Sequence, residues 1–427
     1  MSTQTILILV LAAAILAIVL GTVFNINMGL LALVFAAVIG GFFLGIKPRV
    51  LYTYWPAGVV LQIIGVTFFY GFVNETGAIR ALTDRIMYKV QNVFWLMPVV
   101  VYALAAALGY IGVNPMGINA LLLPIVASIC LHTNRSPFAL FLLYGAGSTA
   151  GLLSPLGSAG IVASGMMNAI VGEAAGAITP RMYLNNFMVS FVVFVIYYIV
   201  FRCWGMKVDD AHKELLREKP APMTRAQKQV LTIMFVTIAF FVVCGVLRIT
   251  VISSVLDVGW VYTLAGIVCL ILKVADQRTV ITRHIPWGII LLVGGFTILL
   301  TIMTSSGCAD MIAHVITQNV SAGAVSPLLG VLAGVTSLFS DSIGVVLPLY
   351  IPICAGTLAT GVSATSVFSA AIIGGLSTGC APFSTGGAMV MSFSPDSMKK
   401  KMFWVMLLAA AVNLVVVTLL SAVGLFG

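Results

Sequence analysis

The chain has 427 residues, of which 61% are hydrophobic and 8% are charged, and its formal net charge is +9. Soluble domains carry roughly 25% charged residues, so this composition excludes an ordinary soluble domain and predicts an integral membrane protein. Basic residues of membrane proteins gather in cytoplasmic loops. Topology therefore explains the positive charge, and no nucleic-acid partner is expected.

The first half is expected to cross the membrane about five times, because its apolar runs approach the roughly 20 residues of a membrane span. A re-entrant hairpin is expected over 93–131, with its tip near Gly112–Gly117, and an amphipathic interfacial helix over Glu75–Gln91. The expected crossings are Ile6–Leu20, Met28–Leu44, Pro56–Val73, the broken helix Pro137–Val171, and Phe187–Phe201.

Two polar, glycine-rich segments interrupt apolar sequence at matching places, Ser154–Gly160 in the first half and Ala381–Gly387 in the second. A helix interrupted at membrane depth is tolerated only where it is buried in protein or lines a cavity. A matched pair of such interruptions is typical of the binding site of a secondary transporter.

The two halves also share a sequence pattern. A shift of 230 residues places Gly65 on Gly295 and Thr67 on Thr297, and a shift of 227 places Pro155 on Pro382. We interpret the chain as a duplicated unit. The predicted domains are a first inverted repeat, 1–205, a polar linker, 206–228, and a second inverted repeat, 229–427.

The basic residues predict the orientation in the membrane, and the cysteines predict packing. The linker and most of the 21 Lys and Arg residues are placed in the cytoplasm, which gives a positive-inside bias. The expected location is a cell membrane, the bacterial inner membrane. The seven cysteines are scattered through apolar sequence without a CxxC motif, so they predict packing residues and neither disulfides nor a metal site.

The helix breaks would present helix N-termini to the membrane centre, where unpaired N–H groups and partial positive charge favour an anion. The neighbouring side chains are neutral. The alternative is that these small residues only let helices pack closely. The candidate substrate ligands are Asn114, Pro115, Ser154, Pro155, Ser158, Ser340, Ser342, Pro382, Ser384 and Thr385.

Asp341 is the only carboxylate in a predicted break. An ionisable residue inside a membrane is a functional-site hypothesis, so Asp341 is expected to bind a coupling cation or carry a proton. Its alternative role is to cap the helix that begins at Ile343. The candidate Na⁺ ligands are Asn114, Gly157, Asp341 and Ser384, and no cofactor other than a coupling Na⁺ is expected.

An intramembrane hydrolase is a remote alternative, because Gly157–Gly160 faintly resembles a serine-protease loop. A nucleophilic serine needs a general base. The four histidines fall at expected span ends, in loops or in the linker. We therefore do not expect an enzyme.

Two tip motifs carry a family resemblance. Val113-Asn114-Pro115, followed by Leu123-Pro124, is similar to the hairpin tips of the ion transporter superfamily, and Ser340-Asp341-Ser342, followed by Leu347-Pro348, resembles a second copy. Within that superfamily the chain resembles the divalent-anion:sodium symporters and, more closely, the bacterial malonate and dicarboxylate carriers. The resemblance implies an elevator carrier, a dicarboxylate bound between the two tips, two flanking cation sites, and a homodimer.

The chain departs from the family at both tips, since Val113 and Pro115 replace hydroxyl residues and Asp341 replaces Asn. The choice between Na⁺ and H⁺ therefore stays open. We expect an all-α polytopic membrane protein with two inverted repeats, each with about five crossings, a re-entrant hairpin and a broken helix. Its expected function is symport of a small dicarboxylate-type anion with Na⁺ or H⁺, and the alternative is a Na⁺/H⁺ antiporter.

Overall fold

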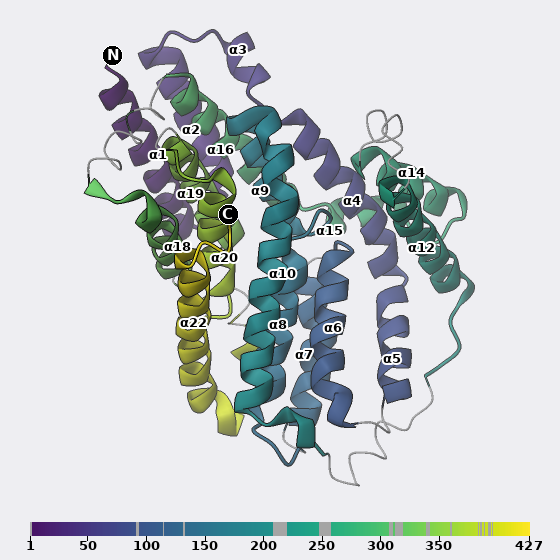
Figure 1. Cartoon of the computed structure of the whole chain (residues 1–427). Coiled ribbons are helices and arrows are strands. Elements are labelled where there is room, and N and C mark those ends of the chain that lie inside the picture. Colours follow the sequence, from purple (N-terminus) through teal and green to yellow (C-terminus); the bar gives the residue numbers. More distant parts are fainter. Residues whose placement is uncertain are drawn as a thin grey trace.

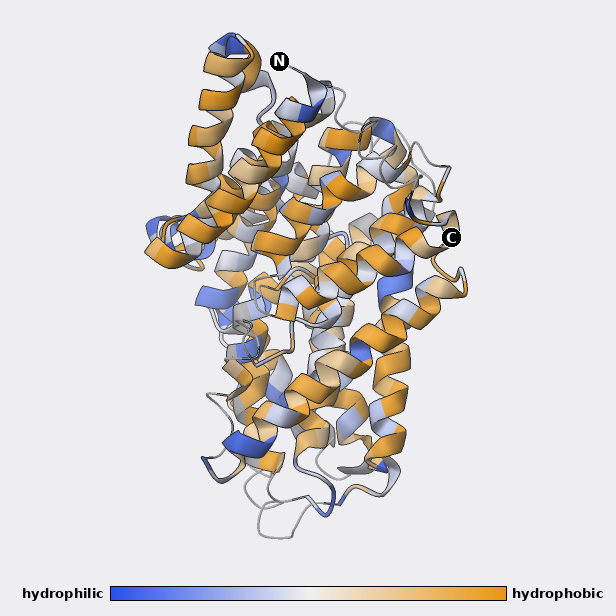
Figure 2. Ribbon diagram, turned by 90° about the vertical axis from the view of Figure 1, so that its left-hand side faces the viewer, coloured by the Kyte–Doolittle hydropathy of each residue, from blue (hydrophilic) through white to orange (hydrophobic). Residues whose placement is uncertain are grey.

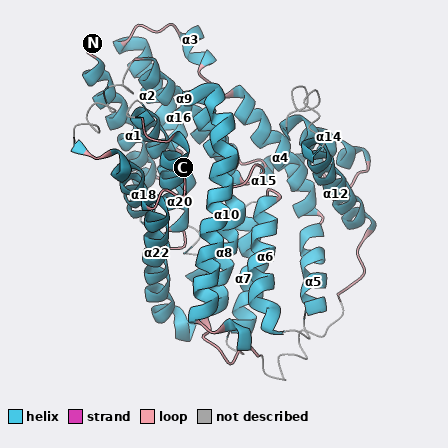
Figure 3. Ribbon diagram, viewed as in Figure 1, coloured by secondary structure: helices cyan, strands magenta, loops and turns pink. Residues whose placement is uncertain are grey.

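The computed structural model of the chain is built from helices, and the residues it describes include no β-strand (Figure 1, Figure 3). The all-α prediction is therefore confirmed. The described residues are 2–90, 94–113, 115–130, 133–207, 220–246, 258–306, 311, 319–338, 342–358, 361–382, 384, 387, 389–391, 394 and 396–427.

The helices of the first half follow the predicted apolar runs. The side chain of Ser2 caps the first helix by accepting from the N–H of Thr5, and Asn25 ends that helix in the left-handed region at φ 54°. The helices are α1 (Thr3–Phe24), α2 (Met28–Ala37) with the π-helical η1 (Val38–Phe43), α3 (Pro48–Thr53), α4 (Ala57–Glu75), α5 (Ala78–Val90), α6 (Met97–Tyr110), α7 (Pro115–Cys130), α8 (Phe138–Leu152), α9 (Ser158–Val171) and α10 (Ala175–Val200).

The second half begins with α12 (Arg225–Val246), which starts inside the predicted linker. Thr224 and Gln227 explain this start, because each side chain accepts from the backbone N–H of the other and forms a capping box. Residues 208–219 of the linker lie outside the described part. The later helices are α14 (Val258–Ile271), α15 (Gln277–His284), α16 (Trp287–Ser305), α18 (Ala322–Leu338), the π-helical η5 (Ser342–Val346) with α19 (Leu347–Thr357), α20 (Ala364–Ser377) and α22 (Lys399–Ala422).

Helix bounds recur between the halves with the shifts read from the sequence. α4 and α16 coincide at both ends after a shift of 230 residues, and α2 and α14 begin 230 residues apart. A hydrogen bond recurs after the shift of 227. The side-chain amide of Asn186 donates to the carbonyl of Ala150 at 3.2 Å, and that of Asn413 donates to the carbonyl of Ser377 at 3.0 Å. These recurrences support a duplicated unit.

Glycines set a reciprocal contact between the halves. α4 packs against α14 and α16 packs against α2. A methyl group on Gly65 would collide with the carbonyl of Gly259, and one on Gly295 would collide with the carbonyl of Gly29. The contact of one half is thus repeated with the partners exchanged, which is the pattern expected of two units related by a pseudo-twofold axis. The inverted orientation in a membrane and the predicted domain limits stay predictions.

We predict that Gly65→Ala and Gly295→Ala each destabilise the protein by about 1–3 kcal/mol, because the added methyl meets backbone that cannot move aside cheaply. Gly58→Ala is the matched control, since Gly58 lies on α4 with nothing within 4 Å of the added methyl group. Thermal unfolding of the purified protein measures the effect. Unchanged melting temperatures for both contact variants would contradict the packing.

The first predicted interruption is present in part, because Ser158–Gly160 belong to α9, and the second is described only at residues 381, 382, 384 and 387. α6 and α7 flank a turn in which Gly112 adopts φ 92°. Residues 153–157 separate α8 from α9, and α20 ends at Ser377 before the turns at 378–382. The arms of the predicted hairpin are therefore helical over Met97–Tyr110 and Pro115–Cys130, while its re-entrant course stays a prediction.

Hydrophobic residues run along the helices, and hydrophilic residues gather mostly near helix ends and in loops (Figure 2). Within the described part, three stretches are long and apolar enough to cross a membrane. The pair α15 and α16, bent by 49°, supplies a fourth if it is one span. All but the last residue of the predicted crossing Phe187–Phe201 falls within a longer run, Ser158–Val200, that joins α9 to α10. The three stretches are Thr3–Gly21, Ser158–Val200 and Asp396–Ala422.

Candidate binding cavity

A cavity of about 470 Å³ lies where the interrupted segments of the two halves meet. Its walls come from α7, α8 and the start of α9 in the first half, and from the start of α16, η5 and the segment after α20 in the second. The lining residues are Asn27, Pro115, Asn119, Tyr144, Gly145, Ser148, Thr149, Leu152, Ser158, Gly288, Ile289, Leu292, Ser342, Ile343, Gly344, Leu376, Gly379, Cys380, Ser384 and Val390.

Helix starts border this cavity on several sides. Pro115 is the first residue of α7, and Ser158 is the first of α9. In the second half, Ser342 begins η5 and Gly288 lies in the first turn of α16. Helix starts carry unpaired N–H groups and partial positive charge, and the lining residues that the structure describes include no charged side chain. The arrangement favours an anion over a cation in the large cavity.

The residues predicted as ligands fall into three groups. Pro115, Ser158, Ser342 and Ser384 line the cavity. Ser154, Pro155, Gly157 and Pro382 do not contribute to its lining. Asn114, Ser340, Asp341 and Thr385 lie outside the described residues. The structure thus brings candidates from both halves to one cavity, and their contacts with a ligand stay predictions.

Ser154 holds the first break together. Its hydroxyl accepts from the N–H of Gly157 at 2.9 Å and donates to the carbonyl of Tyr110 at 3.1 Å. The residue is 1% exposed, so these bonds satisfy backbone groups that water cannot reach. Ser154 therefore shapes the turn between α8 and α9 and ties it to the end of α6.

Ser384 has a similar structural role in the second break. Its hydroxyl accepts from the N–H of Gly387 at 3.0 Å and lies within hydrogen-bond distance of the carbonyl oxygens of Gly379 and Ala381. The backbone is equally tight in both breaks, because a methyl on Gly160 would meet the carbonyl of Ser154 and one on Gly387 would meet that of Ala381. Only glycine fits at these two positions.

Ser158 and Ser342 differ in what their hydroxyls contact. The Ser158 hydroxyl oxygen is buried and has no hydrogen-bond partner within the described protein, and Ser158 is one of the residues that line the cavity. The Ser342 hydroxyl lies 2.7 Å from that of Ser337 and donates to the carbonyl of Gly375 at 3.1 Å. A buried, unpaired hydroxyl is costly unless a ligand or water satisfies it, so Ser158 is the stronger ligand candidate.

One wall of the cavity is a polar stripe on α8 that lies outside the predicted set of ligands. Tyr144 donates to the side-chain oxygen of Asn119, and the amide nitrogen of Asn119 lies 3.3 Å from the sulfur of Met389. Ser148 follows Tyr144 by four residues and Thr149 follows Gly145 by four, so all lie on one face of the helix. That spacing is the signal that could have added Tyr144 to the predicted site.

Asn27 joins the two halves at another wall. Its side-chain oxygen accepts from the N–H of Gly29 and caps α2, while its amide nitrogen donates to the carbonyl of Gly288 at 2.9 Å. A contact over 261 residues of sequence cannot be read from local pattern. Only the tertiary structure therefore shows that Asn27 belongs to the site.

The lining residues that the structure describes include no His, Asp or Glu. Among the described residues, no group of three or more His, Cys, Asp or Glu side chains could hold a metal ion. His284 lies 2.8 Å from the carboxylate of Glu75, and neither residue lines the cavity. The described lining thus offers Ser158 no histidine or carboxylate as a general base.

Comparison with known proteins found one matching family model and similar solved structures. Residues 1–152 match a family model described as the dicarboxylate carrier protein MatC N-terminus. The structure resembles the crystal structure of the Alcanivorax borkumensis YdaH transporter, with a TM-score of 0.59 and 13% sequence identity, over 87% of this chain and 86% of that one. A search of curated proteins found no significant match.

The chain therefore shares the fold of a solved transporter, its first 152 residues are similar to a dicarboxylate carrier family, and its apolar helices indicate a multi-pass membrane protein. The resemblance to bacterial dicarboxylate carriers predicted from the tip motifs is confirmed by the family match over residues 1–152.

Proposed function

We propose that this chain is a secondary active transporter that moves a small dicarboxylate-type anion across a membrane in symport with Na⁺ or H⁺. The observation that carries the proposal is the cavity itself, where helix starts from both halves meet polar, uncharged side chains. Fixed N–H dipoles can hold a carboxylate without a basic residue. The name of the matched family supports a dicarboxylate as the substrate class.

Coupling to a cation follows from the charge of the cargo. An anion entering a cell works against the membrane potential, so a co-transported Na⁺ or H⁺ would supply the driving force. The alternative is a Na⁺/H⁺ antiporter. Vesicles that contain the protein and a pH dye distinguish the two functions, because Na⁺-driven proton movement without carboxylate uptake would favour the antiporter.

The recurrence of helix bounds supports a duplicated unit, and we propose that the two copies are inverted repeats over 1–205 and 229–427, joined by a cytoplasmic linker. With them we propose an elevator-type carrier that forms a homodimer in a bacterial inner membrane. Single cysteines at Lys213 and Lys400 should be labelled from the cytoplasm, and one at Arg181 from the outside, in a variant lacking the native thiols. Labelling of Arg181 and Lys400 positions from one face would contradict the inversion.

A thermal-shift panel tests the substrate class. A ligand that binds only the folded protein raises its melting temperature by mass action. We expect malonate or succinate to stabilise the purified protein, and monocarboxylates of similar size to do so less. Uptake of radiolabelled malonate and succinate into proteoliposomes is the functional counterpart. Stabilisation by neither dicarboxylate, together with no uptake, would overturn the proposal.

We predict that Ser158→Ala lowers the affinity for the anion about 2- to 10-fold, which corresponds to one hydrogen bond of roughly 0.5–1.5 kcal/mol. Ser164→Ala is the control, because Ser164 lies on α9 and its hydroxyl donates to the carbonyl of Ile161 outside the cavity. The thermal shift as a function of anion concentration measures both. Equal affinities in the two variants would remove Ser158 from the binding site.

A further inference from the structure

Two loops meet beyond the end of α10, and hydrogen bonds of Asn134 hold them together. The side-chain amide of Asn134 donates to the carbonyl of Gly205 at 3.1 Å. Its side-chain oxygen accepts from the N–H of Lys207 at 2.7 Å, and its own N–H donates to the carbonyl of Lys207 at 3.0 Å. The resulting loop junction consists of residues 133–136 and 202–207, and only the folded protein brings these two segments together.

The loop junction contains three basic residues. The guanidinium of Arg135 lies against Gly205, because a methyl group on that glycine would collide with it. Arg202 belongs to the same turn, since its carbonyl accepts from the N–H of Gly205 at 3.4 Å, and both Arg202 and Lys207 are exposed. Within the described part of the chain, no carboxylate forms an ion pair with any of the three. Their positive charge can therefore attract an anion from outside the protein.

Arg135 and Arg202 each have an unusual environment. The Nε atom of Arg135 is buried and has no hydrogen-bond partner within the described protein, and a buried donor without an acceptor is costly. Arg202 has φ 49°, in the left-handed region where helix ends commonly have glycine. An anionic ligand would satisfy the Nε–H of Arg135 and account for an arginine at position 202.

A column of aromatic rings leads along α10 to the loop junction. The ring centroids of Phe191 and Phe194 are 6.1 Å apart, and those of Phe194 and Tyr198 are 5.6 Å apart. The column ends at Trp204, whose ring centroid lies 6.3 Å from that of Tyr198. Phe191 and Trp204 are exposed, so both ends of the column reach the protein surface, and its apolar rings suit a hydrocarbon chain.

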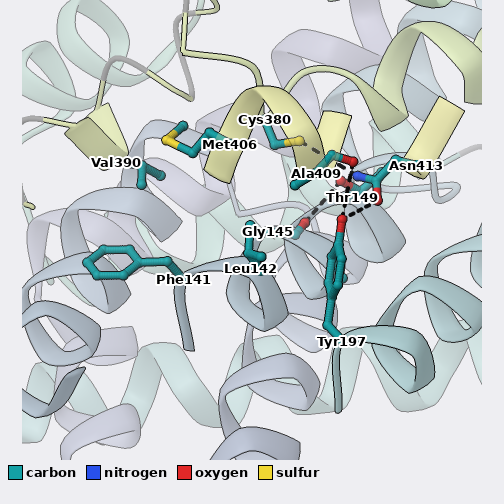
Figure 4. Close-up of a pocket in the computed structure, with 11 residues that line it drawn as sticks. Phe141, Leu142, Gly145, Thr149, Tyr197, Cys380, Val390, Met406, Ala409 and Asn413 are labelled. Atoms are coloured by element: carbon teal, nitrogen blue, oxygen red, sulfur yellow. Dashed lines mark hydrogen bonds between the residues drawn. The ribbon is translucent and has the colours of Figure 1, made fainter. Parts of the chain in front are cut away.

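Contact with α22 sets the rotation of α10. The Tyr197 hydroxyl points toward Asn413 of α22 and donates to its side-chain oxygen at 2.7 Å, which turns this face of α10 to the protein interior (Figure 4). Ile199 and Val200, next along the helix, are exposed. They end the stretch Ser158–Val200, which is long and apolar enough to cross a membrane. The loop junction therefore begins just beyond a membrane span.

Two exposed tryptophans accompany the loop junction. Trp95 lies in η2 (Phe94–Leu96) and Trp204 in η4 (Cys203–Gly205), and these short helices pack against each other. Their side chains are 54% and 53% exposed. The end of α10 and the start of α6, which follows η2, lie at the same end of the molecule (Figure 1). Tryptophan is enriched where a membrane meets water, so we expect the three basic residues at the depth of the lipid headgroups.

We propose that the loop junction binds the phosphate headgroup of an anionic phospholipid, with Arg135 as the principal ligand. A guanidinium donates to phosphate oxygens through a fixed fork of N–H groups. Arg202 and Lys207 add positive charge that attracts anionic lipids, and one acyl chain lies along the ring column of α10. The rings favour a lipid over free phosphate, because only the lipid has an apolar part that covers them.

Melting temperatures in a neutral detergent test the site, with phosphatidylglycerol added at rising mole fraction and phosphatidylcholine of the same acyl chains as the comparison. We expect phosphatidylglycerol to stabilise the wild-type protein more strongly, because a lipid bound only to the folded state raises its melting temperature. Arg135→Gln should weaken the apparent affinity for phosphatidylglycerol about 10-fold, the effect of one lost charge-assisted hydrogen bond. Arg202→Gln and Lys207→Gln should each weaken it about 5-fold.

Two controls remove the same charge elsewhere. Arg181 is exposed in the first turns of α10, at its other end, and Lys400 is exposed at the start of α22. Arg181→Gln and Lys400→Gln should keep the wild-type affinity, whereas Arg135→Lys, which keeps the charge without the fork of donors, should bind more weakly. Equal stabilisation by the two lipids would overturn the proposal, as would equal losses of affinity in the controls and the variants of the loop junction.

Two further measurements exclude other partners of these cations. If inorganic phosphate and glycerol 1-phosphate stabilise the protein as well as phosphatidylglycerol does, and Trp204→Ala binds the lipid normally, the ligand is a soluble phosphate and the lipid proposal falls. Asp209 and Asp210 of the linker lie outside the described residues. A lower melting temperature without lipid in Asp209→Asn with Asp210→Asn, together with no preference of the wild type for phosphatidylglycerol, would show that the cations hold the linker instead.

Discussion

Gly145→Leu should reduce anion uptake by about 10- to 100-fold while leaving the protein folded. Gly145 lies on α8 at the cavity wall, and a Cβ built there meets nothing within 4 Å. A leucine side chain would therefore occupy cavity space that the anion needs. Overpacking should cost the anion-bound state about 1–3 kcal/mol, which corresponds to that loss of uptake. Leucine is also a better helix former than glycine, so the protein should stay folded.

Uptake into proteoliposomes measures the loss of transport, and the melting temperature without ligand measures whether the protein stays folded. Gly176→Leu is the matched control, since Gly176 lies near the start of α10, with nothing within 4 Å of an added Cβ, and does not line the cavity. The control should transport normally. Normal uptake by Gly145→Leu would show that the anion does not occupy this cavity.

Ser154→Ala should destabilise the protein by about 1–3 kcal/mol, because it leaves the carbonyl of Tyr110 and the N–H of Gly157 without the partner they have now. The melting temperature should fall, and anion affinity measured well below that temperature should change much less. Ser158→Ala should show the opposite pattern, with lower affinity at an unchanged melting temperature.

Comparison of these two serines separates the shaping of the break from binding of the ligand. Ser305→Ala is the control for Ser154→Ala, because the Ser305 hydroxyl donates to Ile302 near the end of α16, away from both breaks. A large loss of affinity with no change in melting temperature for Ser154→Ala would instead place Ser154 among the ligands.

The sequence by itself determined the class of protein and the places where its helices break. Low charge content required spans in lipid, where every backbone group needs an internal partner. Apolar runs of about 20 residues fit helical spans, so an all-α fold followed. Pro155 and Pro382, with the glycines near them, marked the breaks because proline and glycine act locally on the backbone. The duplication was visible because repeated units keep the residues at close contacts, such as Gly65 and Gly295.

Only the tertiary structure decided which residues at those breaks face the cavity. Ser154 and Ser158 are four residues apart and have the same chemistry, but the hydroxyl of Ser154 is bonded to the end of α6, whereas Ser158 is a lining residue of the cavity. Asn27 reaches Gly288 across the two halves, and Tyr197 reaches Asn413. Side-chain direction at a helix break depends on distant neighbours that pack against it, and local sequence pattern carries no record of those neighbours.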